Sequence, residues 1–159
     1  MEESNGRKKT LTPQQAKLKA ESYCAYQERA QQEVRDKLYE WGLHHDEVEN
    51  IVTQLIVDNY LNEERFAKAF ALGKFRMKGW GKIKIKQHLK AKRVSPPLIK
   101  IALEEIDLDE YEEKLEEIIK KKTNKPTTNL SLTEKAKLIR YLQSKGYENE
   151  IILNIISKK

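Results

Sequence analysis

Apolar side chains recur along most of the chain at the three- and four-residue spacing that is typical of amphipathic helices. The first such segment begins at Thr12, which can cap a helix that has Pro13 at its first position and Gln15 as a capping-box partner. We expect this helix to end near Arg29. Further helix starts are predicted at small polar residues that favour the N-cap, namely Asp46, Asn62, Ser95, Asp109 and Ser131.

A set of seven positions occurs three times in one register, with offsets of 51 and then 53 residues and no gap inside the matched core. The three copies are Val34, Leu38, Gly42, Leu43, Val48, Ile51 and Val52; Ile85, Leu89, Arg93, Val94, Ile99, Ala102 and Leu103; and Leu138, Leu142, Gly146, Tyr147, Ile152, Ile155 and Ile156. Each copy contains one position that suits the end of a helix. This register predicts three copies of one helical unit, which we call the first, second and third repeats.

The copies also give the expected domain organisation. We expect a disordered segment over residues 1–11, which is polar and lacks periodicity, and repeats over residues 12–59, 60–108 and 109–159. Glycine and proline are scarce, which favours helices over strands. The residues therefore predict an all-α protein in which several small helical cores stack.

At two places in the second repeat the sequence allows more than one local structure. Residues 83–86 alternate apolar and basic side chains as a strand would, but the repeat register puts Ile85 and Leu89 on one helix, so we predict a helix. Arg93 stands where its counterparts are glycines, which suit the left-handed residue after a helix. A side chain there costs roughly 1 kcal/mol or less. Either the turn differs in this repeat or the extra cation is worth the strain.

Composition narrows the class of protein. The chain has 159 residues, of which 38% are hydrophobic and 35% charged, so several small cores suit it better than one large core. Cys24 is the only cysteine, which excludes an internal disulfide and fits a reducing compartment. The first residues lack the apolar segment of a signal peptide, and no apolar run reaches the length of a membrane span. We expect a soluble cytoplasmic protein.

No set of residues has the spacing of a catalytic site. Gly79-Trp80-Gly81 lacks the length and the following residues of a phosphate-binding loop. His44, His45 and Asp46 lie in one short segment, where a helix cap is a better explanation of the aspartate than a metal site. We therefore expect no enzyme, no cofactor and no metal.

The strongest functional signal is a basic run in the second repeat. From Lys74 to Arg93 the chain has nine Lys or Arg residues and no Asp or Glu, and the aromatic residues Phe70, Phe75 and Trp80 lie in or beside it. A solvated helix face is the alternative explanation, but the other repeats do not share the run, so the fold does not require it. We expect contact with a polyanion or an acidic surface. The candidate contact residues are Lys74, Arg76, Lys78, Lys82, Lys84, Lys86 and Arg93.

The chain resembles the RecX family, the regulators of the RecA recombinase. The resemblance is carried in the second repeat by Tyr60-Leu61, Glu63-Glu64, Arg65-Phe66-Ala67, Lys78-Gly79-Trp80-Gly81, Lys84-Ile85, Leu89, Lys92 and Val94. Weaker matches are Arg29, Glu33-Val34 and Lys37-Leu38 in the first repeat and Lys145-Gly146-Tyr147 in the third. The chain departs from the family pattern at Asn62, Lys82 and Arg93, where Asp, Pro and Gly are more usual.

The resemblance implies three tandem three-helix repeats in an elongated, curved, right-handed or solenoid-like array. It also implies a monomer that binds the RecA–single-stranded DNA filament in its groove and inhibits ATP hydrolysis, strand exchange and coprotease activity. The associated processes are recombination, DNA repair and the SOS response. The resemblance implies no catalysis by the chain itself.

Two other functions agree with the residues. A three-helix unit with a basic helix also describes DNA-binding proteins that act without RecA, although no repeat has the Asn, Gln and Arg cluster that base reading favours. The chain could also be a helical scaffold that binds only protein. Binding to naked DNA and recovery of RecA without DNA distinguish these functions from the first.

Overall fold

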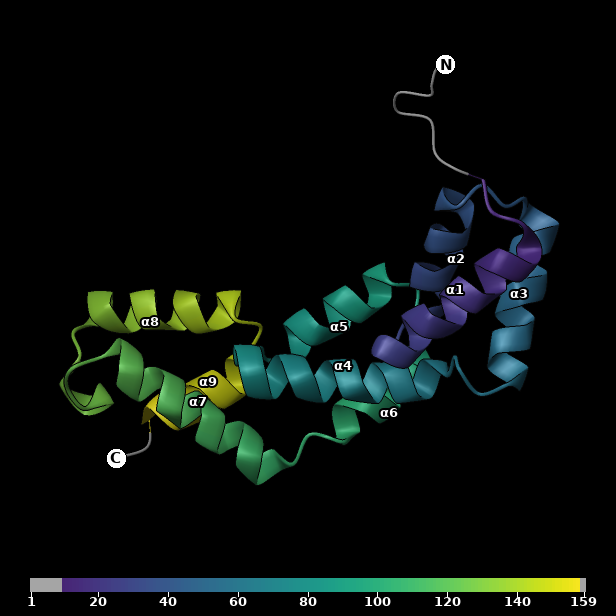
Figure 1. Cartoon of the computed structure of the whole chain (residues 1–159). Helices are drawn as coiled ribbons and strands as arrows, with labels where there is room; N and C mark the ends of the chain where they lie inside the picture. The colour runs from purple at the N-terminus through teal and green to yellow at the C-terminus, as the bar shows by residue number, and fades with distance from the viewer. Residues whose placement is uncertain (1–9, 158–159) are drawn as a thin grey trace, which may run out of the picture. The chain divides into compact units, whose positions relative to one another are not determined.

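The structure, a computed structural model, describes residues 10–157, which contain helices and no strand (Figure 1). The helices are α1 (Pro13–Tyr26), α2 (Gln31–Glu40), α3 (His45–Val57), α4 (Glu63–Lys78), α5 (Lys82–Ala91), α6 (Pro96–Glu104), α7 (Leu108–Lys122), the 3-10 turn η1 (Thr127–Asn129), α8 (Leu132–Ser144) and α9 (Asn149–Ser157). The all-α class is confirmed, with three α-helices in each repeat. The curvature of the array stays a prediction.

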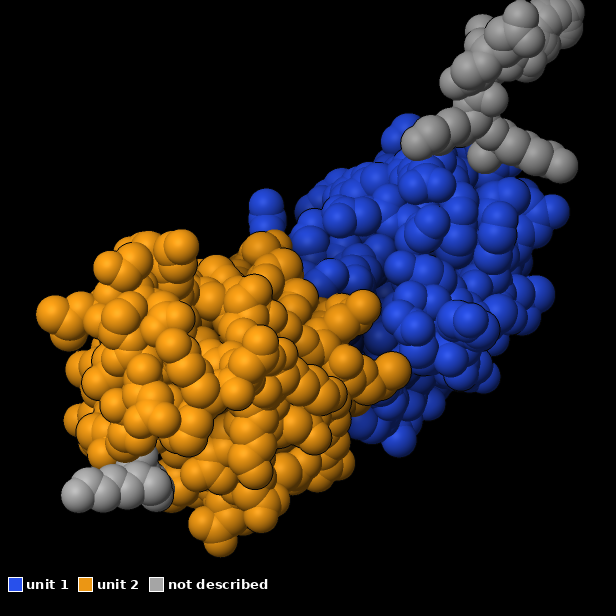
Figure 2. All heavy atoms as spheres, turned by 90° about the vertical axis from the view of Figure 1, so that its left-hand side faces the viewer, with its two compact units in different colours: residues 1–67, 92–94 blue, residues 68–91, 95–159 orange. Residues whose placement is uncertain are grey.

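The chain divides into two compact units (Figure 2). Unit 1 comprises the residues up to Ala67 together with Lys92–Val94, and unit 2 comprises Lys68–Ala91 together with the residues from Ser95 onwards. Helix α4 therefore begins in unit 1 and ends in unit 2. The units do not follow the expected repeat bounds, which stay a prediction.

Unit 1 has a core of small and aliphatic side chains from its three complete helices. Ala16 and Ala20 of α1 are buried against Val34 and Leu38 of α2 and against the buried face of α3. The predicted capping box at Thr12 is confirmed, because the Gln15 amide donates to Thr12 Oγ1 over 3.2 Å. The expected disordered segment, residues 1–11, lies outside the described residues up to residue 9, and Leu11 packs partly buried against this core.

The start of α3 differs from the prediction. Its N-cap is His44, whose backbone N–H donates to the Glu47 carboxylate, and Asp46 lies inside the first turn. The predicted cap at Asp46 is therefore wrong. The Glu47 carboxylate accepts this hydrogen bond from within the first turn, so Asp46 and Glu47 both lie at the positive end of the helix dipole.

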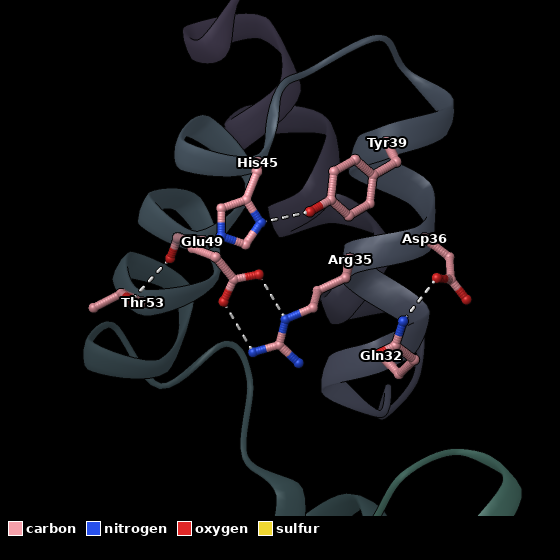
Figure 3. A network of polar contacts seen from close by, with 7 residues as sticks. All are labelled: Gln32, Arg35, Asp36, Tyr39, His45, Glu49 and Thr53. Carbon is pink, nitrogen blue, oxygen red and sulfur yellow. Dashed lines mark hydrogen bonds and ion pairs between the residues drawn. The ribbon is translucent and has the colours of Figure 1, made fainter.

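Polar side chains join α2 to α3 on one face of unit 1 (Figure 3). Arg35 forms two hydrogen bonds with Glu49, of 2.8 and 3.2 Å, which hold the pKa of that carboxyl below its usual range. The Tyr39 hydroxyl lies 3.0 Å from His45 Nδ1. Part of the acidic charge of the first repeat is thus neutralised within the repeat.

Unit 2 buries the apolar positions that the repeat register predicted. Ile85 and Leu89 of α5, Leu138 and Leu142 of α8, and the inner face of α9 are all buried. Across both units, Leu103 is the one apolar residue of the register that is only partly buried. Helix α7 begins after Asp107, which accepts a hydrogen bond from the Glu110 amide, so the predicted start at Asp109 is wrong by two residues.

The three turns that follow α2, α5 and α8 share one backbone conformation. Gly42, Arg93 and Gly146 have φ values of 92°, 62° and 98°. The turn of the second repeat therefore has the same left-handed residue as the other two turns. Arg93 adopts the left-handed conformation and carries the strain that a side chain has there.

Candidate functional site

The centre of the basic run is the α4–α5 turn, Gly79–Gly81, and it lies against the third repeat within unit 2. Helix α5 starts without an acidic residue in its first turn. Three consecutive backbone N–H groups instead donate to residues of the third repeat. Gly81 donates to the Lys145 carbonyl over 2.7 Å, Lys82 to the Tyr111 hydroxyl over 2.8 Å, and Ile83 to the Gly146 carbonyl over 2.9 Å. The α8–α9 turn thus caps a helix of another repeat.

Two glycines allow this close approach. A Cβ on Gly81 would lie 2.4 Å from the carbonyl carbon and oxygen of Gly146. A Cβ on Gly146 would lie 2.4 Å from Cβ of Lys84. The two segments that carry the family resemblance in the second and third repeats, Lys78–Gly81 and Lys145–Tyr147, are therefore each other's partners.

Tyr111 of α7 is buried next to the same turn and hydrogen-bonds to the residue that follows it. Its side chain is 1% exposed, and its ring packs against Phe75 and Tyr147. Its hydroxyl accepts from the Lys82 amide and donates to Glu148. Burial, followed by the hydrogen bond to Glu148, raises the pKa of Tyr111 far above its ordinary value, so the hydroxyl keeps its proton.

Trp80 is half-buried and gathers two of the predicted contact residues around its ring. The Nζ atoms of Lys74 and Lys84 lie 5.1 and 4.8 Å from its ring centroid, within cation–π range. His88 packs against the same ring with centroids 4.4 Å apart. Trp80 therefore packs within the basic run, between two of its lysines and His88.

Lys145, which was not among the predicted contact residues, adds a cation beside the turn. Its Nζ donates to the Lys78 carbonyl over 2.9 Å, which brings a lysine of the third repeat beside the basic run. Burial and the neighbouring Lys84 ammonium lower the pKa of Lys145. Burial has the larger effect on this pKa, and the repulsion from Lys84 adds to it.

The other predicted contact residues fall in different surroundings. Arg76 forms two hydrogen bonds with Glu110 of α7, of 2.8 and 3.1 Å, so an acidic residue from outside the basic run opposes its charge. Arg93 lies in unit 1, next to Lys92, which pairs with Glu33. Within residues 10–157, the remaining predicted contacts form no ion pair with a carboxylate: Lys74, Lys78, Lys82, Lys84 and Lys86.

Lys82 and Lys86 line a groove between α5 and α6, together with Lys90 and Lys100. Lys90 and Lys100 were not among the contact residues predicted from the sequence. The four-residue spacing of Lys82, Lys86 and Lys90 was a visible signal, since it places the three lysines on one helix face. The position of Lys100 on the opposite wall follows only from the packing of α6.

Two other kinds of site are not found in the part of the chain that the structure describes. Its longest apolar helices are too short to cross a lipid bilayer. Its His, Cys, Asp and Glu side chains do not gather in threes that could hold a metal ion, and His45 instead contacts Tyr39.

Comparison with known families matches the chain in three consecutive parts. Residues 16–55 match the model of the first three-helix domain of RecX, residues 62–103 the second and residues 109–156 the third. Each match falls inside one of the expected repeats.

Curated relatives have the same name. The Regulatory protein RecX of Bacillus cereus (strain B4264) is 30% identical over 139 residues, which cover 87% of this chain and 52% of the relative. That of Clostridium perfringens (strain 13 / Type A) is 31% identical over 134 residues, which cover 82% of this chain and 61% of the relative. The chain spans about half the length of the first of these relatives.

Solved structures agree with the fold. The crystal structure of RecX from Lactobacillus salivarius superposes with a TM-score of 0.81 at 25% identity and covers 91% of this chain and 94% of its own. A second crystal structure, of a regulatory protein RecX, has a TM-score of 0.77 at 21% identity, which supports the fold alone.

Proposed function

Because the chain belongs to the RecX family of regulatory proteins, we propose that it binds the filament that RecA forms on single-stranded DNA and inhibits it. It lodges in the groove of that filament and lowers ATP hydrolysis, strand exchange and coprotease activity. It acts as a cytoplasmic monomer. The chain itself performs no catalysis.

The observation that carries this proposal is the set of lysines on α4 and α5 that no carboxylate neutralises within residues 10–157. Lys82 and Lys84 lie in the first turn of α5, at the positive end of the helix dipole, where cations are unfavourable. The stability of the helix therefore does not account for them. A filament that exposes phosphates or acidic protein surface complements this charge.

The contact residues differ in their expected contributions. The largest contributions come from the lysines that no carboxylate of residues 10–157 pairs with, namely Lys74, Lys78, Lys82, Lys84 and Lys86. Arg76 contributes less, because Glu110 already holds its guanidinium. Arg93 presents its exposed side chain from the turn after α5.

The test is the single-stranded-DNA-dependent ATPase of RecA, measured with and without the full chain. The variant that combines Lys82→Glu, Lys84→Glu and Lys86→Glu should lose the inhibition. Its helicity by circular dichroism should match that of the wild-type chain, since glutamates suit the start of α5. Undiminished inhibition by a folded variant would refute the assignment of the site.

A charge-matched control separates a local contact from net charge. Lys120 and Lys121 of α7 and Lys137 of α8 are exposed and lie outside the basic run. Reversing these three lysines to Glu changes the net charge by the same amount, and the inhibition should persist. Equal loss in both variants would indicate a nonspecific effect of charge.

A salt titration on naked single- and double-stranded DNA distinguishes the alternative function. The proposal predicts weaker binding to naked DNA than to the filament at the same salt concentration. Tight binding to DNA without RecA, with a steep dependence on salt, would instead support a sequence-nonspecific DNA-binding protein.

A further inference from the structure

The groove between α5 and α6 combines positive walls with an apolar floor. It has a volume of about 310 Å³. Lys82, Lys86 and Lys90 follow one another at four-residue intervals, or about 6 Å apart along α5, and Lys100 comes from α6. Glu104 is the one carboxylate among the described residues that line the groove.

The floor of the groove contains an apolar side chain that the repeat pattern would have buried. The floor is formed by Pro96, Ile99 and Leu103 of α6. The counterparts of Leu103 in the other repeats, Val52 and Ile156, are only 2% and 6% exposed. Leu103 is partly open to the groove, so an apolar group that entered the groove would complete its burial.

The chemistry of the floor distinguishes a polypeptide from a nucleic acid. Charge alone would suit a phosphate backbone as well as a row of carboxylates. Among the described residues, however, no aromatic ring lines the groove, and bases stack on aromatic rings. The aliphatic side chains of the floor offer a phosphate no hydrogen bond and no positive charge, and the Glu104 carboxylate repels it. An aliphatic side chain of a protein gains from that floor.

We propose that the α5–α6 groove binds an acidic amphipathic helix of a partner protein. Carboxylates at four-residue intervals on that helix have the same spacing as Lys82, Lys86 and Lys90. An aliphatic side chain between them packs against Leu103. The inference rests on the proposed function only for the identity of the partner. If that partner is the RecA filament, the groove is the part of the basic surface that contacts its protein.

The test uses the full chain and a fluorescein-labelled synthetic peptide of about four helical turns, with glutamates every four residues beside a leucine stripe. Fluorescence anisotropy gives the Kd. The wild-type chain should bind this peptide. Lys86→Glu should weaken binding by about tenfold or more through charge repulsion. Leu103→Gln should weaken it by about tenfold through the lost apolar contact.

Matched controls test each part of the inference. Lys120→Glu, an equal change of charge on α7, should leave the Kd unchanged, and Leu103→Met should retain binding and the wild-type circular dichroism. A peptide with serines in place of its leucines should bind about tenfold more weakly. The Kd of the chain for oligothymidylate should not change on Leu103→Gln.

Two outcomes would overturn the proposal. One is peptide binding that Lys86→Glu weakens but Leu103→Gln does not, which would show a site for charge alone. The other is absence of peptide binding to the wild-type chain. The peptide assay contains no RecA, so it is independent of the ATPase assay. If either outcome occurred while the wild-type chain still inhibited the RecA ATPase, the proposed function would stand. If the wild-type chain bound the peptide but did not inhibit the ATPase, only the proposed function would be refuted.

Discussion

Arg93 adopts a φ of 62° in a turn where both counterparts are glycines. A left-handed conformation costs a residue with a side chain about 1 kcal/mol relative to glycine. The position therefore retains a cation at the expense of stability.

We expect Arg93→Gly to raise the free energy of unfolding by about 0.5–1 kcal/mol in urea denaturation, because it relieves this strain. Arg93→Ala is the matched control, since it removes the same charge and keeps a Cβ in the left-handed turn. An equal gain from both variants would show that the charge, and not the backbone, destabilises the turn.

Cys24 makes a pH-dependent contribution to the free energy of unfolding. Burial raises the pKa of its thiol to about 11, so the folded state holds the proton more tightly than the unfolded state does. This stabilisation is fully present below the unfolded thiol pKa, near 8.5, and is lost as pH rises from there towards 11.

We expect alkylation of Cys24 by iodoacetamide at pH 8 to be about a hundredfold slower in the folded chain than in urea, because the thiolate is the reactive form. Cys24→Ala should reduce the fall in unfolding free energy between pH 8.5 and 11. Equal alkylation rates in folded and unfolded chains would contradict the protection of the thiol by burial.

At the scale of elements, the α4–α5 turn depends on the α8–α9 turn. The backbone of Gly81 approaches Gly146 so closely that a Cβ at position 81 would overlap its carbonyl group. The same approach lets Gly81 and Ile83 donate hydrogen bonds to the third repeat.

We expect Gly81→Ala to lower the free energy of unfolding by about 2 kcal/mol, because the turns must separate. Gly73→Ala is the control. Gly73 lies inside α4, and a Cβ there would meet nothing within 4 Å, so alanine should raise the free energy of unfolding by about 0.5–1 kcal/mol. Urea denaturation measures both variants. Similar effects of the two would contradict the role of the turn contact.

Sequence patterns predicted which helix faces are buried, because burial follows helical periodicity within a few turns. They were less accurate at helix starts such as Asp107, since two nearby acidic residues cap equally well and tertiary packing chooses between them. The ion pair of Arg76 with Glu110, 34 residues away in the chain, was out of reach for the same reason. The charge of the basic run could be read from the sequence, whereas its division between the Trp80 ring and the α5–α6 groove could not.

At the scale of the whole molecule, the division into two compact units gives each unit its own reporter. Of the two tryptophans, Trp41 belongs to unit 1 and Trp80 to unit 2. Trp41 lies partly buried against the core of unit 1.

We expect a substitution in unit 2 to affect the two reporters unequally. In the single-tryptophan variants Trp41→Phe and Trp80→Phe, adding Gly81→Ala should lower the urea midpoint seen at Trp80 more than the midpoint seen at Trp41. Tryptophan fluorescence measures both. Equal shifts would show that the chain unfolds as one cooperative body.

The glycine-to-glycine approach between Gly81 and Gly146 has an evolutionary consequence. No amino acid is smaller than glycine, so a mutation at one position has no compensating mutation at the other. A descendant that gained a side chain at either place would have to part the two turns and leave the start of α5 uncapped. Genetic drift in the third repeat is therefore restricted by a helix of the second, and a duplication that copied only one of these repeats would separate a pair that must be inherited together.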